Sequence, residues 1–322
     1  MVALALAVLL SASPFQDPGR QTAPPVQQEA PAEPGAVDLG EIEVTGRPLD
    51  RMIRSFVNEV AEPNQRRGLA RWENHICIGV ANLRTEPAQY IVDRVSTIAE
   101  DIGLTPGEPG CKPNVIVIAS DRPADVAREL TRERRGAFRM GGSGMDRGGD
   151  ALEDFVASRA PVRWWQVSVP VNSETGEIAV RMPGYCRDTC DSSGGSTPED
   201  YAPTIAVFAA SRLSTQIRDE LFRTVVIIDV DKTSGVSAHQ LADYVAMVTL
   251  AQIDPEADTS GYASILNLFD DPGATTGLTE WDRAYLQGLY DAQRTRRNLR
   301  AGRVEIADSI SRAHEAIRAD DE

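Results

Sequence analysis

The chain has 322 residues, of which 42% are hydrophobic, so it can bury a sizeable core in one large domain or two small ones. Its formal net charge is −15 at pH 7. General binding to nucleic acid or to an anionic membrane surface requires a basic face, so this charge argues against both functions and no nucleic-acid partner is expected.

The first thirteen residues, MVALALAVLLSAS, predict a signal peptide. The apolar run from Val2 to Leu10 is too short to span a bilayer, and small residues follow it, as at a cleavage site. No Lys or Arg precedes the run, so the translation start is left open; the alternative is a frayed apolar N-terminus. No later segment has the ~20 apolar residues of a transmembrane helix.

Residues 14–40 are rich in Pro, Gln, Ala and Glu and have almost no large apolar side chains, so we expect a disordered tether. The stretch from Glu41 to Arg47 (EIEVTGR) resembles the TonB box near the start of mature TonB-dependent receptors. A plain edge strand through Ile42 and Val44 is the alternative. Together these features predict a periplasmic or secreted protein of the bacterial envelope.

Export gives the four cysteines a meaning, because an oxidising compartment lets them form two disulfides by any of three pairings. We expect Cys77 to pair with Cys111 and Cys186 with Cys190. The spacing of the latter two, C-x-x-x-C, supplies too few ligands for a structural zinc site. It also has one residue too many for a thioredoxin motif.

The folded part begins with a helix over Met52–Val60 and a strand over Arg71–Asn82. A helical period then covers Pro87–Ile102, and Asn114–Ala119 (NVIVIA) is a continuous apolar run, typical of a strand covered on both faces. These elements predict a strand, helix, strand unit with a parallel pair.

A glycine-rich stretch, FRMGGSGMDRGGD, follows a helix over Asp125–Arg134. It lacks the Lys-Ser/Thr of a phosphate-binding loop, so we expect a mobile surface loop. The sequence NSETG between Trp164–Val171 and Glu177–Met182 indicates a hairpin. Further strands are expected over Thr204–Ala210 and Thr224–Val230.

The stretch SAHQLADYVAMVTLAQ, residues 237–252, predicts a buried helix, because almost every residue from Leu241 to Ala251 is apolar. Ser237 and Gln240 have the spacing of a capping box at its start. His239 and Asp243 lie four residues apart and therefore on one face, the spacing of two metal ligands on one helical turn.

Residues 261–291 resemble the end of a matrixin-like metzincin catalytic domain, and the order of the earlier elements suits that family. Ser264, Ile265, Leu266 and Asn267 stand where such zinc proteases have their Met-turn, and Leu278-Thr279 with Asp282 resembles their closing helix. The resemblance implies a domain over residues 41–300 with an α/β fold of the α+β zincin-like kind. This fold has a mostly parallel twisted sheet with an antiparallel edge strand, stacked on two long helices, plus a C-terminal helical part. A further helix is expected over 301–322.

The zinc-binding motif of that family is degenerate here. The pattern H-E-x-x-H-x-x-G-x-x-H falls on His239, Gln240, Asp243, Ala246 and Thr249. Only the first ligand is retained, and Gln240 stands at the position of the general base, where a neutral amide accepts no proton. Leu266 replaces the methionine of the Met-turn, a swap of similar volume.

The leading hypothesis is an exported, metzincin-like domain without zinc, cofactor or peptidase activity, which has a binding or structural role in the cell envelope. An unknown protein or peptide partner is expected. One alternative is an active metallopeptidase in which His239, Asp243 and a later carboxylate (Asp254, Glu256 or Asp258) hold zinc. The other is an envelope adaptor or structural protein unrelated to proteases, in which His239 and Asp243 form only a helical ion pair.

Overall fold

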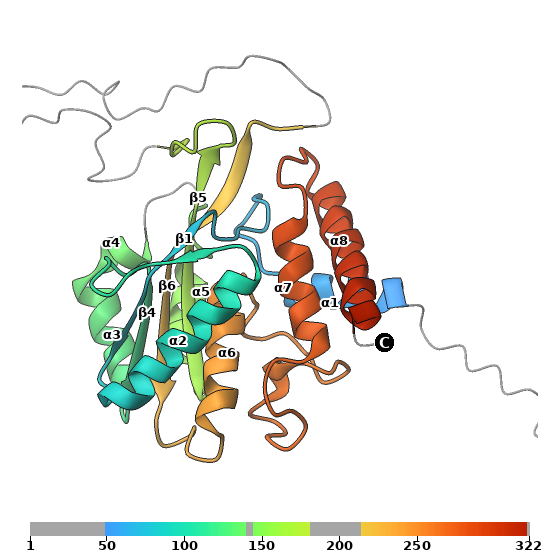
Figure 1. The fold of residues 1–322 in the computed structure, drawn as a ribbon. Coiled ribbons are helices and arrows are strands. Elements are labelled where there is room, and N and C mark those ends of the chain that lie inside the picture. The colour runs from blue at the N-terminus through green and yellow to red at the C-terminus, as the bar shows by residue number, and fades with distance from the viewer. Residues whose placement is uncertain (1–48, 140–143, 181–213, 321–322) are drawn as a thin grey trace, which may run out of the picture. The chain divides into compact units, whose positions relative to one another are not determined.

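The computed structural model describes residues 49–139, 144–180 and 214–320. The expected signal peptide, tether and TonB-box-like stretch, as well as Cys186, Cys190 and the strand over Thr204–Ala210, lie outside these residues. No helix in the described ranges is long and apolar enough to cross a membrane. The described chain is a mixed α/β structure with a largely parallel sheet (Figure 1).

The sheet has four strands in the order β2-β4-β6-β5. Strands β2 (Ile78–Ala81), β4 (Val115–Ser120) and β6 (Ile217–Asp229) are parallel, and β5 (Val162–Asn172) pairs antiparallel with β6 at the edge. The predicted parallel pair on either side of a helix is therefore confirmed for β2 and β4.

Side chains alternate between the two faces of this sheet and build two separate cores. Trp164 packs in the larger core, while its neighbour Trp165 packs in the smaller one. On β6, Val226 and Ile228 pack in the larger core with Trp164, and Ile227 packs in the smaller core with Trp165. Both faces are covered, which explains why the strand sequences read as continuous apolar runs.

Helices cover each face. The larger core contains the apolar sides of α2 (Thr85–Asp101) and α6 (Ala238–Leu250), which pack against one another. The smaller core is closed by α3 (Pro123–Glu133), α4 (Arg135–Phe138) and α5 (Gly149–Ala157). Figure 1 shows α2 and α6 side by side in front of the sheet.

The strand expected over Arg71–Asn82 is divided at Cys77. Before this residue, β1 (His75–Ile76) pairs with β3 (Thr105–Pro106) in a separate small sheet, and after it β2 joins the main sheet. Cys77 forms the expected disulfide with Cys111. Its carbonyl accepts the N–H groups of Asn114 and Val115, so the backbone turns from one sheet to the other at this point.

The expectation of a surface loop in the glycine-rich stretch is wrong for the part that the structure describes. Met145 is only 1% exposed and packs in the smaller core, and its carbonyl accepts the N–H of Ser168 on β5. Asp146 is buried beside Arg139, with Oδ1 2.9 Å from Nε. Between Gly144 and Gly148, therefore, Met145 and Asp146 are buried, and Met145 packs against the smaller core.

The described part of the expected hairpin contains the turn after β5 and a bridge between Ile178 and Val171. Along its whole length β5 pairs with β6. Strand β6 begins seven residues before the expected Thr224, because its first half is partly exposed and carries charged side chains that conceal the strand pattern.

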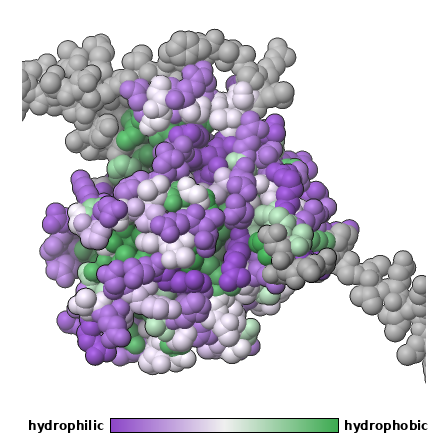
Figure 2. Space-filling model, viewed as in Figure 1, coloured by the Kyte–Doolittle hydropathy of each residue, from purple (hydrophilic) through white to green (hydrophobic). Residues whose placement is uncertain are grey.

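A helical layer stands beside the sheet. It consists of α1 (Leu49–Val60), α7 (Glu280–Asp291) and α8 (Leu299–Asp320), with α8 packed on both others. Val304, Ile306 and Ile310 belong to an apolar stripe along α8, in which Ile306 and Ile310 are buried in the larger core, whereas Val304 is 42% exposed. The visible face of the described chain is mainly hydrophilic, with apolar residues in smaller patches between (Figure 2).

Candidate functional site

The site begins at the first turn of α6. The Ser237 side chain accepts the backbone N–H of Gln240, and the Gln240 side chain accepts the N–H of Ser237, so the predicted capping box is confirmed. This start places His239 and Asp243 on one face, with His239 Nε2 3.5 Å from Asp243 Oδ2. The structure therefore brings together the two residues that the sequence proposed as remnant metal ligands.

Asp243 is fully buried and both of its carboxylate oxygens are engaged. Arg94, on α2, donates from Nε to Oδ1 at 2.5 Å and from Nη2 to Oδ2 at 3.1 Å. The backbone N–H of Leu278 donates to Oδ2 at 2.6 Å. The pair with Asp243 raises the pKa of Arg94, against the opposing effect of burial. A guanidinium therefore neutralises this carboxylate, which the sequence offered only as a remnant metal ligand.

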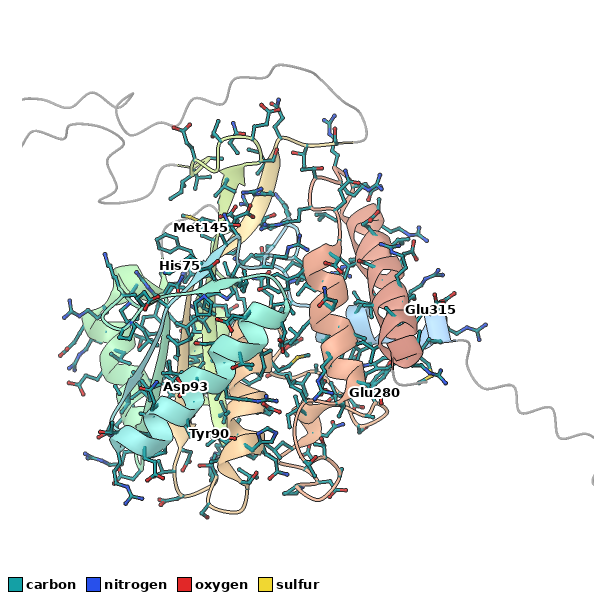
Figure 3. The ribbon with its side chains drawn as sticks, viewed as in Figure 1. His75, Tyr90, Asp93, Met145, Glu280 and Glu315 are labelled. Atoms are coloured by element: carbon teal, nitrogen blue, oxygen red, sulfur yellow. A yellow bond between two sulfur atoms is a disulfide. The ribbon has the colours of Figure 1, made fainter. Side chains whose placement is uncertain are left out.

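His239 is held on its other side by Tyr90. The Tyr90 hydroxyl oxygen lies 3.0 Å from His239 Nδ1, and Figure 3 shows Tyr90 between α2 and the beginning of α6. The imidazole side chain is 44% exposed. Its Nδ1 thus forms a hydrogen bond with a phenol hydroxyl, while its Nε2 faces a carboxylate oxygen at 3.5 Å.

Gly277 lies directly against the pair. A Cβ at this residue would be 2.5 Å from Asp243 Oδ2 and 2.7 Å from His239 Nε2, so a larger residue would force both side chains to shift. The backbone from Gly277 to Leu278 therefore fills the space beside both side chains.

Gln240 is used to hold the neighbouring loop. Its Nε2 donates to the carbonyls of Pro272 and Thr275 at 2.9 and 2.7 Å, while its Oε1 caps the helix. All of these contacts suit a carboxamide, because a glutamate would lack the N–H donors. The residue at the general-base position thus joins the start of α6 to the loop that contains Pro272 and Thr275.

The other positions of the degenerate motif face the protein core. Ala246 and Thr249 are fully buried, and the Thr249 hydroxyl donates to the Val245 carbonyl one turn earlier at 2.7 Å. Trp72 Nε1 donates to the Thr249 carbonyl at 2.8 Å. Neither position supplies a ligand toward His239.

The later carboxylates are not brought to the pair. They follow the end of α6, and His239 lies eleven positions before Leu250 on this helix, a rise of roughly 17 Å. Asp254 lies near Arg147, at 4.0 Å, and Asp258 accepts hydrogen bonds from Ser260. In the described ranges, no group of three or more His, Cys, Asp or Glu residues is placed to hold a metal.

The segment expected to resemble a Met-turn forms a short 3-10 helix, η2 (Ile265–Asn267), which contacts α6. Ser264 Oγ donates to Asp282 at 2.6 Å, and the Ile265 N–H donates to the same carboxylate at 2.8 Å. Asp282 also belongs to a capping box with Thr279 at the start of α7. Burial raises the pKa of Asp282, although these hydrogen bonds act in the opposite direction.

Sequence reasoning missed three residues that define this site: Tyr90, Arg94 and Gly277. Tyr90 and Arg94 are four residues apart on α2, so their common face could have been noticed. Their partners lie 149 residues later, and no local signal indicates that distance.

The residues around His239 and Asp243 do not fit a zinc ion. Catalytic zinc requires three protein ligands and an open position, whereas here one imidazole stands beside a carboxylate already occupied by a guanidinium and an amide N–H. Comparisons with models of protein families, with curated proteins and with solved structures found no match for this chain.

Proposed function

We propose that this chain is an exported, metzincin-like domain without zinc or peptidase activity, which acts by binding a protein or peptide in the bacterial envelope. The observation that carries this proposal is the bidentate ion pair between Arg94 and Asp243. In support of it, the carboxylate that would have to bind zinc is paired with a guanidinium, and the backbone at Gly277 lies directly against His239 and Asp243.

The arrangement of elements supports the zincin-like part of the proposal. Three parallel strands with an antiparallel edge strand carry two long helices, α2 and α6, on one face. The η2 turn contacts α6 as the resemblance implies for a Met-turn. The Cys77–Cys111 disulfide supports export, because such bonds persist in oxidising compartments.

The alternative of an active metallopeptidase receives less support. It needs a third ligand near His239, and the expected carboxylates lie beyond the opposite end of α6. It also needs a general base, and the Gln240 side chain is committed to the helix cap and to two loop carbonyls.

The test is the metal content and proteolytic activity of the full chain, purified without chelators and then supplied with zinc. We expect substoichiometric zinc and no cleavage of casein or of unstructured peptides. His239→Ala should change neither quantity. His75→Ala is the matched control, because His75 is an exposed histidine on β1, far along the chain from the pair.

Stoichiometric zinc together with cleavage that His239→Ala abolishes and His75→Ala preserves would overturn the proposal. Stoichiometric zinc that both variants retain would place the metal at another site and would overturn the zinc-free part of the proposal.

A further inference from the structure

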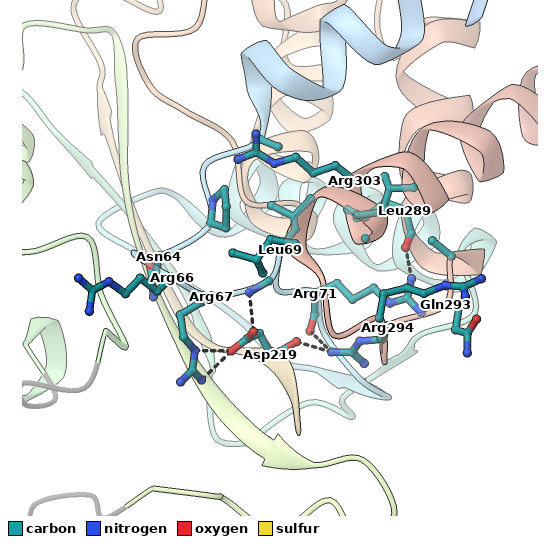
Figure 4. Close-up of a pocket in the computed structure, with 18 of the residues that line it drawn as sticks. Asn64, Arg66, Arg67, Leu69, Arg71, Asp219, Leu289, Gln293, Arg294 and Arg303 are labelled. Atoms are coloured by element: carbon teal, nitrogen blue, oxygen red, sulfur yellow. Dashed lines mark hydrogen bonds and ion pairs between the residues drawn. The ribbon is translucent and has the colours of Figure 1, made fainter. Parts of the chain in front are cut away.

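A cavity of about 230 Å³ lies at the far end of α7 from His239. Its walls come from the segment 61–71 after α1, the last turn of α7 and the first turns of α8 (Figure 4). The site of His239 adjoins Leu278, before α7 begins, so the two places are separated by the length of this helix.

The cavity wall is rich in positive charge, although the chain as a whole is negatively charged. The whole sequence has 48 acidic and 33 basic residues, yet the lining contains six arginines and one carboxylate, Asp219. The arginines are Arg66, Arg67, Arg71, Arg294, Arg296 and Arg303. Such a concentration in an acidic protein marks a place suited to an anion.

Part of this positive charge is compensated within the described chain. Arg67 pairs with Asp219 at 2.6 Å, Arg296 pairs with Glu305 at 2.8 Å, and Arg294 pairs with Glu73. These pairs fix the wall, because each arginine is held by a carboxylate on another segment. They leave three arginines for other partners.

Among the described residues, no carboxylate forms an ion pair with Arg66, Arg71 or Arg303. Arg71 donates to the carbonyl of Leu289 and lies over the Tyr290 ring, 5.4 Å from its centroid. Arg303 reaches only the neutral Asn58, at 3.5 Å. Burial, with a smaller effect from the neighbouring Arg294, lowers the pKa of Arg71 to about 10.

The rest of the cavity is apolar. Leu69, Leu289 and Ile306 line it, and Leu299 stands among them with 48% of its surface exposed. Leu299 is one of few large apolar side chains that the described chain leaves in water. A ligand with an apolar group would cover it, which an inorganic anion would not do.

We propose that this cavity binds a small carboxylate with an adjoining apolar group, the chemistry that the carboxy-terminal residue of a peptide presents. Guanidinium groups match a carboxylate through paired N–H donors. The volume lies below the roughly 300–1,000 Å³ typical of pockets for drug-sized ligands, so the occupant is small. This proposal goes beyond the proposed function and does not depend on any relation to metalloproteases.

The test is ligand-observed NMR titration of the full chain with N-acetyl-leucine, N-acetyl-leucinamide and inorganic phosphate. We expect saturable binding of N-acetyl-leucine and binding weaker by about tenfold or more for the amide and for phosphate. Acetylated tetrapeptides that end in leucine, as carboxylate or carboxamide, then distinguish a peptide terminus from a free small molecule. A carboxylate peptide that binds more tightly than N-acetyl-leucine indicates the former.

The variants are Arg66→Gln with Arg303→Gln, for the charge, and Leu299→Gln, for the apolar wall. These residues are exposed, so the fold should persist, as checked by circular dichroism. The matched control is Arg122→Gln with Arg312→Gln, which removes two exposed arginines outside the cavity. We expect at least about tenfold weaker N-acetyl-leucine binding for the first pair, weaker binding for Leu299→Gln, and no change for the control.

Absence of saturable binding by both carboxylate probes overturns the proposal. So does equal affinity for N-acetyl-leucinamide or phosphate, or a loss of affinity in the control as large as in the cavity variants. Unchanged affinity in the Arg66 and Arg303 variant would also overturn it.

Discussion

Asp243 illustrates how a single buried charge determines its surroundings. A carboxylate with no solvent exposure is costly unless it is paired and hydrogen-bonded. In this protein Arg94 supplies the charge, and the N–H of Leu278 supplies a further hydrogen bond. The pair therefore links α2, α6 and the approach to α7 at one point.

Replacement of Arg94 by glutamine should lower the free energy of unfolding by about 2–4 kcal/mol, because Asp243 would be left buried without a counter-charge. Urea denaturation measures this change. Arg128→Gln is the matched control: its partner Asp125 is exposed, so the loss should stay below about 0.5 kcal/mol. Equal losses in the two variants would contradict the role given to Arg94.

The sequence predicts one half of this residue network. Helical spacing places His239 and Asp243 on one face, and the capping box fixes where their helix begins. The sequence does not predict that Arg94 and Gly277 meet them, because those contacts depend on how α2 and the loop before α7 pack. For the same reason, a pattern typical of two metal ligands cannot reveal that a guanidinium already occupies the carboxylate.

At the scale of elements, α7 and α8 approach one another most closely at Gly288. A Cβ on this glycine would lie 2.4 Å from the Ile310 Cα on α8, so the backbones are in contact there. Close packing of this kind brings the apolar stripe of α8 into the larger core. It depends on the absence of a side chain at a single position.

Gly288→Ala should therefore lower the free energy of unfolding by about 1–3 kcal/mol, because α8 must move away from α7. The matched control is Gly302→Ala, on α8, where a Cβ meets nothing within 4 Å. The better helix propensity of alanine should there raise stability by up to about 1 kcal/mol. Thermal unfolding of both variants tests the difference in sign; destabilisation by both would refute this account of the helix contact.

Elements with a clear period were predictable, and those determined by packing were not. The apolar runs of β4 and β6 and the period of α2 identify their structures directly. The division at Cys77 depends on which sheet each half joins, and local propensity does not specify that choice. Met145 was missed because glycines surround it, although its own side chain is apolar and packs in a core.

For the molecule as a whole, the disulfide closes a loop that spans β2 and α2. Cys77 and Cys111 are 34 residues apart, so the bond restricts the unfolded chain substantially. The sequence allowed this pairing among three, and the compartment expected from the N-terminus made it chemically reasonable. The acidic net charge, by contrast, gave no sign of the arginine-lined cavity, because composition does not report where charges gather.

The variant Cys77→Ala with Cys111→Ala should lower the free energy of unfolding by about 3–4 kcal/mol, because the unfolded state regains the freedom of that loop. Guanidinium denaturation at equilibrium measures the effect. The variant Cys186→Ala with Cys190→Ala, measured in parallel, is the control that shows how removal of another cysteine pair changes the free energy of unfolding. An unchanged midpoint for the first variant would show that the closed loop contributes little.

The ion pair between Arg94 and Asp243 has one more consequence. A metal ion can be withdrawn by a chelator, by acid or by scarcity in the surroundings, whereas a guanidinium is part of the chain and keeps its charge at every ordinary pH. The charge balance at the first turn of α6 is therefore complete as soon as the chain folds. At this point the fold is independent of the metal supply in its environment.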